Sequence, residues 1–163
     1  MWEQLFIIDM HWPTVWSHLI LLGVAYLLAL PIGWNRERFS RSAGLRTYPL
    51  VAVATCGFML VGIEVLDSNE SAGRAMQGVI TGMGFIGGGA ILKNGNTVSG
   101  MATAASLWST GALGLAVAWQ RFEIALVLSL ITFLTLQFAP RVKSIVDTGE
   151  KKEEDDLKQL INK

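Results

Sequence analysis

The sequence has little charge, little proline and one cysteine. Only 16% of its 163 residues are Asp, Glu, Lys or Arg, well below the ~25% typical of soluble domains. The thirteen basic residues cancel the thirteen acidic ones, so no overall field favours a nucleic acid as partner. The single Cys56 excludes an internal disulfide framework. A mean hydropathy of +0.44 excludes a disordered chain and points to a membrane protein.

Five apolar segments are long enough, or nearly so, to cross a bilayer, which takes about 20 residues of helix. They predict an all-α polytopic membrane protein with five transmembrane helices and short loops. The transmembrane domain covers residues 1–140, and a charged tail follows at 141–163. The predicted helices are 14–34, 48–66, 75–92, 101–119 and 124–139.

Lysine and arginine are concentrated on one side of this predicted arrangement. The loop Asn35–Thr47 carries four arginines, whereas Arg74 and Arg121 are the basic residues expected on the other side. Lys93, Arg141 and Lys143 add to the richer side. By the positive-inside rule, the N-terminus lies outside and the C-terminus in the cytoplasm.

The third predicted helix contains two pairs of glycines spaced four apart, Gly78 with Gly82 and Gly84 with Gly88. Small residues let helix backbones approach closely in lipid. Because the fourth helix is also rich in small residues, we expect the two to form a glycine-rich central hairpin. The alternative is a break near 87–89 that exposes carbonyls to an ion. In the connection, we expect Thr97 or Ser99 to cap the fourth helix.

Ionisable residues are scarce within the predicted spans, where Glu64 lies near the outer end of the second. The sequence shows no pairing of a nucleophile with a base and no paired carboxylates, so we expect no enzymatic activity and no cofactor. Arg46, at the start of the second span, needs a partner, and Glu37 is its natural candidate.

Three motifs together resemble the membrane domain of the MgtC/SapB (also YhiD) family over roughly 22–138. They are A-G-L-R-T at 43–47, G-x-G-F-I-G-G-G at 82–89 and T-A-A-S-L-W at 103–108. The resemblance implies a five-helix bacterial inner-membrane protein with its N-terminus outside. The family's usual acidic residue after the first span falls on Asn35, although Gly33, Arg36 and Glu37 match. The soluble ACT-like domain of long members has no counterpart in 139–163.

The resemblance also implies a role in magnesium homeostasis and growth under magnesium limitation, in acid stress, and in virulence through survival inside macrophages. Its best-described member resembles a regulator that restrains the F-type ATP synthase. We therefore expect a stress-response regulator that binds a membrane protein partner and forms a homo-oligomer, most simply a two-fold dimer.

The alternatives are a small oligomeric channel or carrier for a cation such as magnesium, with a path lined by Glu37, Gln77, Thr81 and Ser106, and a scaffold without a ligand. No metal ligands are assigned. The candidate functional residues are Asn35, Arg36, Glu37, Arg46, Thr47, Gln77, Thr81, Gly82, Gly84, Gly88, Thr103 and Ser106.

Overall fold

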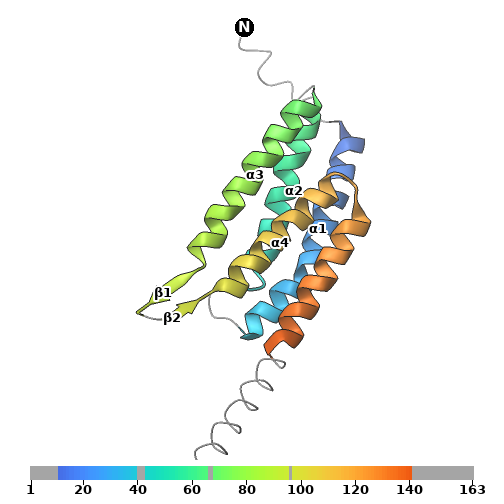
Figure 1. The fold of residues 1–163 in the computed structure, drawn as a ribbon. Coiled ribbons are helices and arrows are strands. Elements are labelled where there is room, and N and C mark those ends of the chain that lie inside the picture. The colour runs from blue at the N-terminus through green and yellow to red at the C-terminus, as the bar shows by residue number, and fades with distance from the viewer. Residues whose placement is uncertain (1–10, 40–42, 66–67, 96, 141–163) are drawn as a thin grey trace, which may run out of the picture.

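The computed structural model describes residues 11–39, 43–65, 68–95 and 97–140, although not the side chains of residues 65 and 69. These residues form a bundle of five helices and one short β-hairpin (Figure 1). The charged tail expected at 141–163 lies outside the described residues. The elements are α1 (Trp12–Phe39), α2 (Thr47–Val65), α3 (Asn69–Gly89), β1 (Leu92–Asn94), β2 (Thr97–Ser99), α4 (Met101–Ala118) and a last helix, Phe122–Pro140.

The predicted five helices are confirmed, and four of them are long and apolar enough to cross a membrane: α1, α2, α4 and the last helix. α3 does not reach that hydropathy, because it begins with a polar turn at Asn69 and is rich in glycine. Its 21 residues extend about 31 Å, which matches the thickness of the hydrocarbon core. The crossing of α3 stays a prediction.

α1 is longer than its apolar segment. It continues to Phe39 instead of ending near Trp34, and it passes through Pro31 without a break. Proline is tolerated inside membrane helices because neighbouring groups satisfy the backbone that it leaves unpaired. Asn35, Arg36 and Glu37 therefore lie on a helix and not in the predicted loop.

The connection between α3 and α4 is an antiparallel hairpin in which Leu92 pairs with Ser99. Thr97 and Ser99 belong to β2, so the prediction that one of them caps α4 is wrong. The N-cap is Gly100, which makes no side-chain cap. A Cβ atom there would collide with the carbonyl of Ala90, and its φ of 88° favours glycine.

α3 and α4 form the predicted hairpin, but of these two helices only α4 lies at the centre of the bundle. It packs against α1, α2 and α3. At Gly114 the backbone of α4 approaches α2 so closely that a Cβ atom would collide with the Ala52 carbonyl and the Thr55 hydroxyl. Gly111 leaves room for the side chain of Met83 on α3, whose Cγ would lie 2.9 Å from an added Cβ atom. The close packing is therefore made by the glycines of α4.

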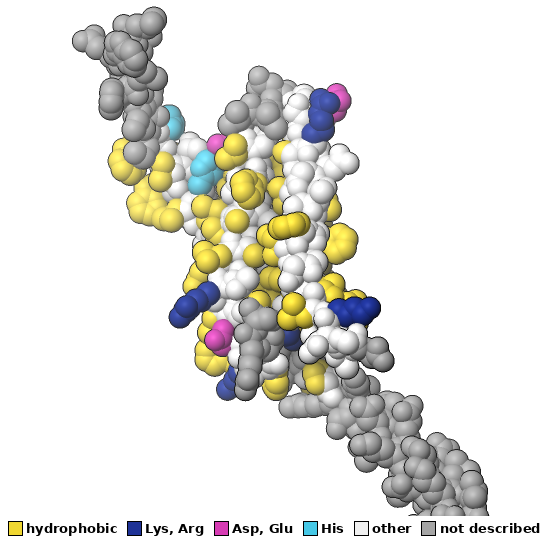
Figure 2. Space-filling view, turned by 90° about the vertical axis from the view of Figure 1, so that its left-hand side faces the viewer, with side chains coloured by type: hydrophobic (Ala, Val, Ile, Leu, Met, Phe, Trp, Pro, Cys, Tyr) yellow, Lys and Arg dark blue, Asp and Glu magenta, His cyan; other side chains and the backbone are white. Residues whose placement is uncertain are grey.

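α3 lies at the edge of the bundle. Cβ atoms built at Gly78, Gly82, Gly84 and Gly88 would meet no atom within 4 Å, so these pairs do not make the α3–α4 contact that their spacing suggested. The alternative, a break near 87–89, is also absent, since the helix runs to Gly89 before it ends. Figure 2 shows this side of the molecule, where charged side chains lie toward the two ends and the middle carries hydrophobic side chains, backbone and uncharged polar side chains.

The close approach at Gly114 predicts a large cost for a single methyl group. Gly114→Ala should lower the stability of the purified protein by about 1–3 kcal/mol, because the α2 backbone has to shift. Gly23→Ala is the matched control, since Gly23 of α1 faces open space. Thermal unfolding in detergent measures both, and equal melting temperatures would contradict the close approach.

Candidate functional site

One end of the bundle carries Arg36, Arg38, Arg46 and Lys93, and we call it the basic end. The loop after α1 and the β-hairpin both lie there (Figure 1). At this end the structure places a buried polar network, made of Asn35, Arg36, Tyr48, Thr103, Ser106 and Gln137.

Arg36 ties α1 to the start of α4. Its Nη2 donates to the Thr103 hydroxyl at 2.7 Å, and Thr103 is 1% exposed. The Arg36 side chain makes no ion pair with a described carboxylate, and its buried Nε lacks a partner within the described part of the chain. The partly buried Arg36 cation is thus bound by a neutral hydroxyl, and this hydrogen bond links α1 to α4.

Tyr48 ties α2 to the same turn of α4. Its fully buried hydroxyl lies 2.6 Å from the hydroxyl of Ser106, which in turn donates to the carbonyl of Thr103 at 3.0 Å. Hydroxyl groups buried in a membrane bundle need such partners. Thr103 and Ser106, both expected at the site, are therefore brought together on one turn of α4, where Thr103 binds Arg36 and Ser106 binds Tyr48.

Asn35 faces the last helix. Its amide nitrogen donates to Oε1 of Gln137 at 2.7 Å, and the residue is 2% exposed. Its Oδ1 atom has no partner among the described residues. The position where the family resemblance implied a carboxylate thus holds a neutral amide, bound to another amide.

Glu37 connects the end of α1 to the loop that follows it. Its carboxylate accepts a hydrogen bond from the Leu45 backbone at 3.0 Å and occupies the space that a Cβ atom of Gly44 would need. Gly33 lies below the same loop, where a Cβ atom would be 3.3 Å from Cα of Leu45. The glycine of the A-G-L-R-T motif is therefore required by the position of Glu37.

The predicted Arg46–Glu37 ion pair is wrong. Glu37 is taken by the Leu45 backbone, while Arg46 is exposed and makes no hydrogen bond or ion pair with the residues described. Because α1 continues past Trp34, the arginine directed into the bundle is Arg36. Thr47 begins α2 beside Arg46.

The remaining candidates lie apart from this network. Gln77, Thr81, Gly82, Gly84 and Gly88 are all exposed on α3. The predicted site is therefore two places: a buried network at the basic end, and an exposed face of α3.

Sequence reasoning missed Tyr48 and Gln137. Both carried a signal, since each is a polar side chain inside or beside an apolar segment, where lipid offers no hydrogen bonds. The motif spacing emphasised Arg46 and Thr47, the neighbours of Tyr48, and Gln137 lay among aliphatic residues near the end of the last predicted helix.

Helices of this length and hydropathy, packed around a buried polar network, define a multi-pass membrane protein. The model of the MgtC family matches residues 22–145. The chain belongs to the MgtC family.

Several relatives agree with this assignment. Protein SrpB of Synechococcus elongatus is 36% identical over 137 residues, which cover 76% of this chain and 75% of SrpB. Protein MgtC of Salmonella typhimurium is 32% identical and protein SapB of Bacillus subtilis also 32%, over 91% and 84% of this chain. The matched regions span 65% of that MgtC and 62% of SapB, less than two thirds of each. No solved structure matches the chain.

The two arginines at the basic end should differ in their effect on stability. Arg36→Gln removes the tie to Thr103 and should cost about 1–3 kcal/mol, the usual range when a buried partner is lost. Arg46→Gln removes no contact within the described structure and should change the melting temperature in lipid-free detergent little. A greater loss of stability for Arg46→Gln than for Arg36→Gln would show that Arg46 has a partner within the protein.

The close contact between Glu37 and Gly44 can be tested by a double-mutant cycle. Gly44→Ala should displace Glu37 and lose its hydrogen bond to Leu45, at a cost of about 1–2 kcal/mol. Because Glu37→Ala removes the same bond, the double variant should be scarcely less stable than Gly44→Ala alone. Additive losses in thermal unfolding would show that the two residues act separately.

Proposed function

We propose that this protein is a regulatory protein of the bacterial inner membrane that acts in adaptation to stress by binding a membrane protein partner. Membership of the MgtC family supports the class. The family resemblance suggests magnesium limitation, acid stress or intracellular survival as the setting, and the F-type ATP synthase as the partner. The observation that carries a partner-binding function is the outward face of α3.

We define this outward face by Gln77, Thr81, Gly84 and Gly88, all exposed. The Thr81 hydroxyl donates to the backbone carbonyl of Gln77 at 2.8 Å. The side-chain amide of Gln77 has no hydrogen-bond partner in the described part of the chain. In the bilayer that α3 is predicted to cross, an unpaired amide is costly, so a second protein that supplies a partner is favoured over lipid.

The glycines make the same face suitable for a helix. At Gly84 and Gly88 no side chain separates the α3 backbone from its surroundings, and a Cβ atom at either would meet nothing within 4 Å. Without a hydrophobic drive between helices, close backbone approach and polar contacts are what hold them together in lipid. A helix of the ATP synthase membrane sector fits this description. A second copy of the chain does too, since an amide near a two-fold axis can pair with itself.

The cation-channel alternative receives less support. Ser106 is buried on α4 beside Tyr48, whereas Gln77 and Thr81 face outward on α3. Glu37 is engaged at the basic end by Leu45. The residues expected along one path do not face each other within a chain, so a path would need several copies.

Proton pumping in inverted membrane vesicles tests the proposal. The protein should reduce acidification driven by ATP while leaving acidification driven by respiration unchanged. Gly84→Leu with Gly88→Leu should restore ATP-driven acidification, because two leucines block close approach on the outward face. Gly23→Leu, which adds one leucine to open space on α1, should act like the wild type.

Three other outcomes would contradict the proposal. Equal loss of acidification under both drives would mean a proton or cation leak and would favour the channel. No effect under either drive would exclude the ATP synthase as partner. Equal behaviour of the outward-face variant and Gly23→Leu would remove that face from the function.

A further inference from the structure

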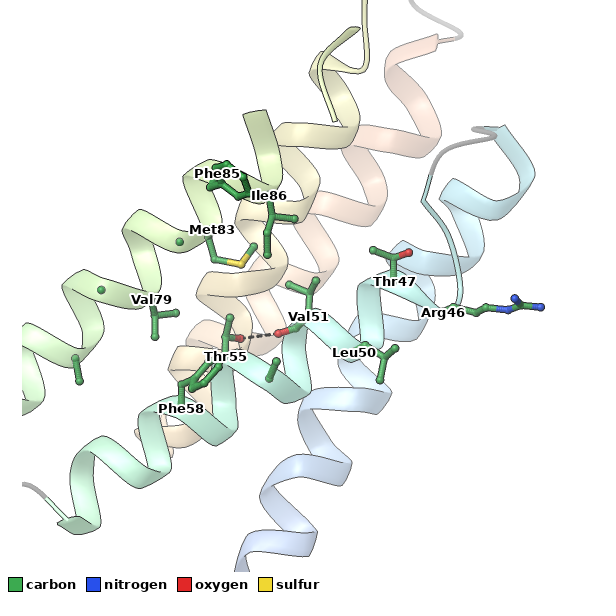
Figure 3. A pocket seen from close by; sticks show the side chains of 14 residues that line it. Arg46, Thr47, Leu50, Val51, Thr55, Phe58, Val79, Met83, Phe85 and Ile86 are labelled. Atoms are coloured by element: carbon green, nitrogen blue, oxygen red, sulfur yellow. Dashed lines mark hydrogen bonds between the residues drawn. The ribbon is translucent and has the colours of Figure 1, made fainter. Parts of the chain in front are cut away.

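A groove of about 890 Å³ runs between α2 and α3. The two helices touch near the end opposite the basic end, where a Cβ atom at Gly62 would be 3.1 Å from Ala75, and they separate toward the basic end (Figure 1). Gly78 and Gly82 leave one wall of the groove hollow. Leu50 and Phe58 of α2 lie on the other wall (Figure 3), together with Ala54.

Apart from Arg46 and Thr47 at its basic end, the described residues that line this groove are apolar, with Thr55 as the one polar side chain. Thr55, which lies on its wall, donates its hydroxyl to the Val51 carbonyl at 3.0 Å. The groove thereby differs from the outward face of α3, where the Gln77 amide lacks a partner. A helix with polar contacts suits the outward face, and a hydrocarbon chain suits the groove.

The basic end of the groove is polar, unlike the groove's interior. Arg46 and Thr47 lie there together, with the Arg46 guanidinium directed away from α3 (Figure 3). Neither side chain has a hydrogen-bond or ion-pair partner among the residues that the structure describes. The first two amides of α2, on Thr47 and Tyr48, already donate to the Gly44 carbonyl, so a ligand at this point would be bound by side chains.

Arg46 differs in this respect from the two arginines of α1. Arg36 donates to Thr103, and Arg38 lies over the ring of Trp34, with its guanidinium carbon 5.5 Å from the ring centre. The Arg46 charge is thus available to a ligand at the membrane boundary.

We propose that the α2–α3 groove binds one anionic phospholipid. An acyl chain lies in the hollow at Gly78 and Gly82, and the phosphate group lies at the start of α2, where the exposed Arg46 side chain turns from its position in Figure 3 to bind it. An apolar groove with a single positive charge at one end matches the polarity of a phospholipid. Basic pockets between membrane helices on the cytoplasmic side bind anionic head groups in this way. The inference does not depend on the proposed function, since the groove and the outward face use different residues of α3.

Native mass spectrometry can test the site. The full chain is released from vesicles of phosphatidylethanolamine that contain a minority of phosphatidylglycerol, and the lipids that stay bound are counted. The wild type should retain one phosphatidylglycerol. Arg46→Gln should lower that occupancy about five-fold, the factor that corresponds to the roughly 1 kcal/mol contributed by one cation. Arg38→Gln is the control of equal charge and should keep the lipid.

The hollow has its own matched pair of variants. Gly82→Leu fills the groove and should abolish retention of phosphatidylglycerol and of phosphatidylethanolamine. Gly84→Leu adds the same side chain outside the groove and should leave retention of phosphatidylglycerol unchanged. Circular dichroism checks that both variants fold, and if Gly82→Leu does not, the comparison of the arginine variants decides.

Three results would overturn the site. Equal retention by Arg46→Gln and Arg38→Gln would exclude recognition of the head group. Equal retention by the two leucine variants would exclude the groove. A lipid-free dimer that only Gly82→Leu dissociates would show that a second copy of the chain fills the groove.

Discussion

The hydroxyl groups of α4 have to find their hydrogen bonds inside the protein, because hydrocarbon offers none. Thr103 receives Arg36 from α1, Ser106 meets Tyr48 from α2, and Thr110 donates to the Ser106 carbonyl of its own helix. These bonds fix two neighbouring helices around one turn of α4, and Gly114 lets the α2 backbone come close enough to complete the packing. The central position of α4 follows from these contacts.

The same packing around α4 leaves α3 at the edge of the bundle. With α1, α2 and the last helix gathered around α4, α3 contacts α4 through Met83 and Gly87 and α2 near Ala75, and its other glycines are left uncovered. A helix with so little apolar side chain is a poor match for lipid on its outward face, where Gln77 lacks a partner. Its groove-facing side, in contrast, is apolar and ends near an unpaired Arg46. The two surfaces differ in chemistry, so we assign them different occupants, a protein helix and a phospholipid.

The helices could be predicted from the sequence because the length and hydropathy of an apolar segment are local properties. The contacts could not, because spacing shows that a helix has a small face but not which neighbour covers it. The glycine pairs of α3 and the small residues of α4 looked equally suited to packing, yet only those of α4 are used. Similarly, Arg46 seemed to be the arginine of the bundle, but the continuation of α1 to Phe39 brings Arg36 to Thr103 instead. Asn35 was a candidate from its place in a motif, whereas its partner Gln137 could be found only once the last helix was placed beside α1.

The central claim is that the outward face of α3 is covered by protein in the native membrane. The collision rate of dissolved oxygen with a spin label attached at position 84 measures this directly, with position 23 on α1 as the lipid-exposed reference and Cys56 replaced by serine. The account predicts a much lower collision rate at position 84 than at position 23 in native membranes. Equal rates at the two positions would show that α3 faces lipid and would contradict the account.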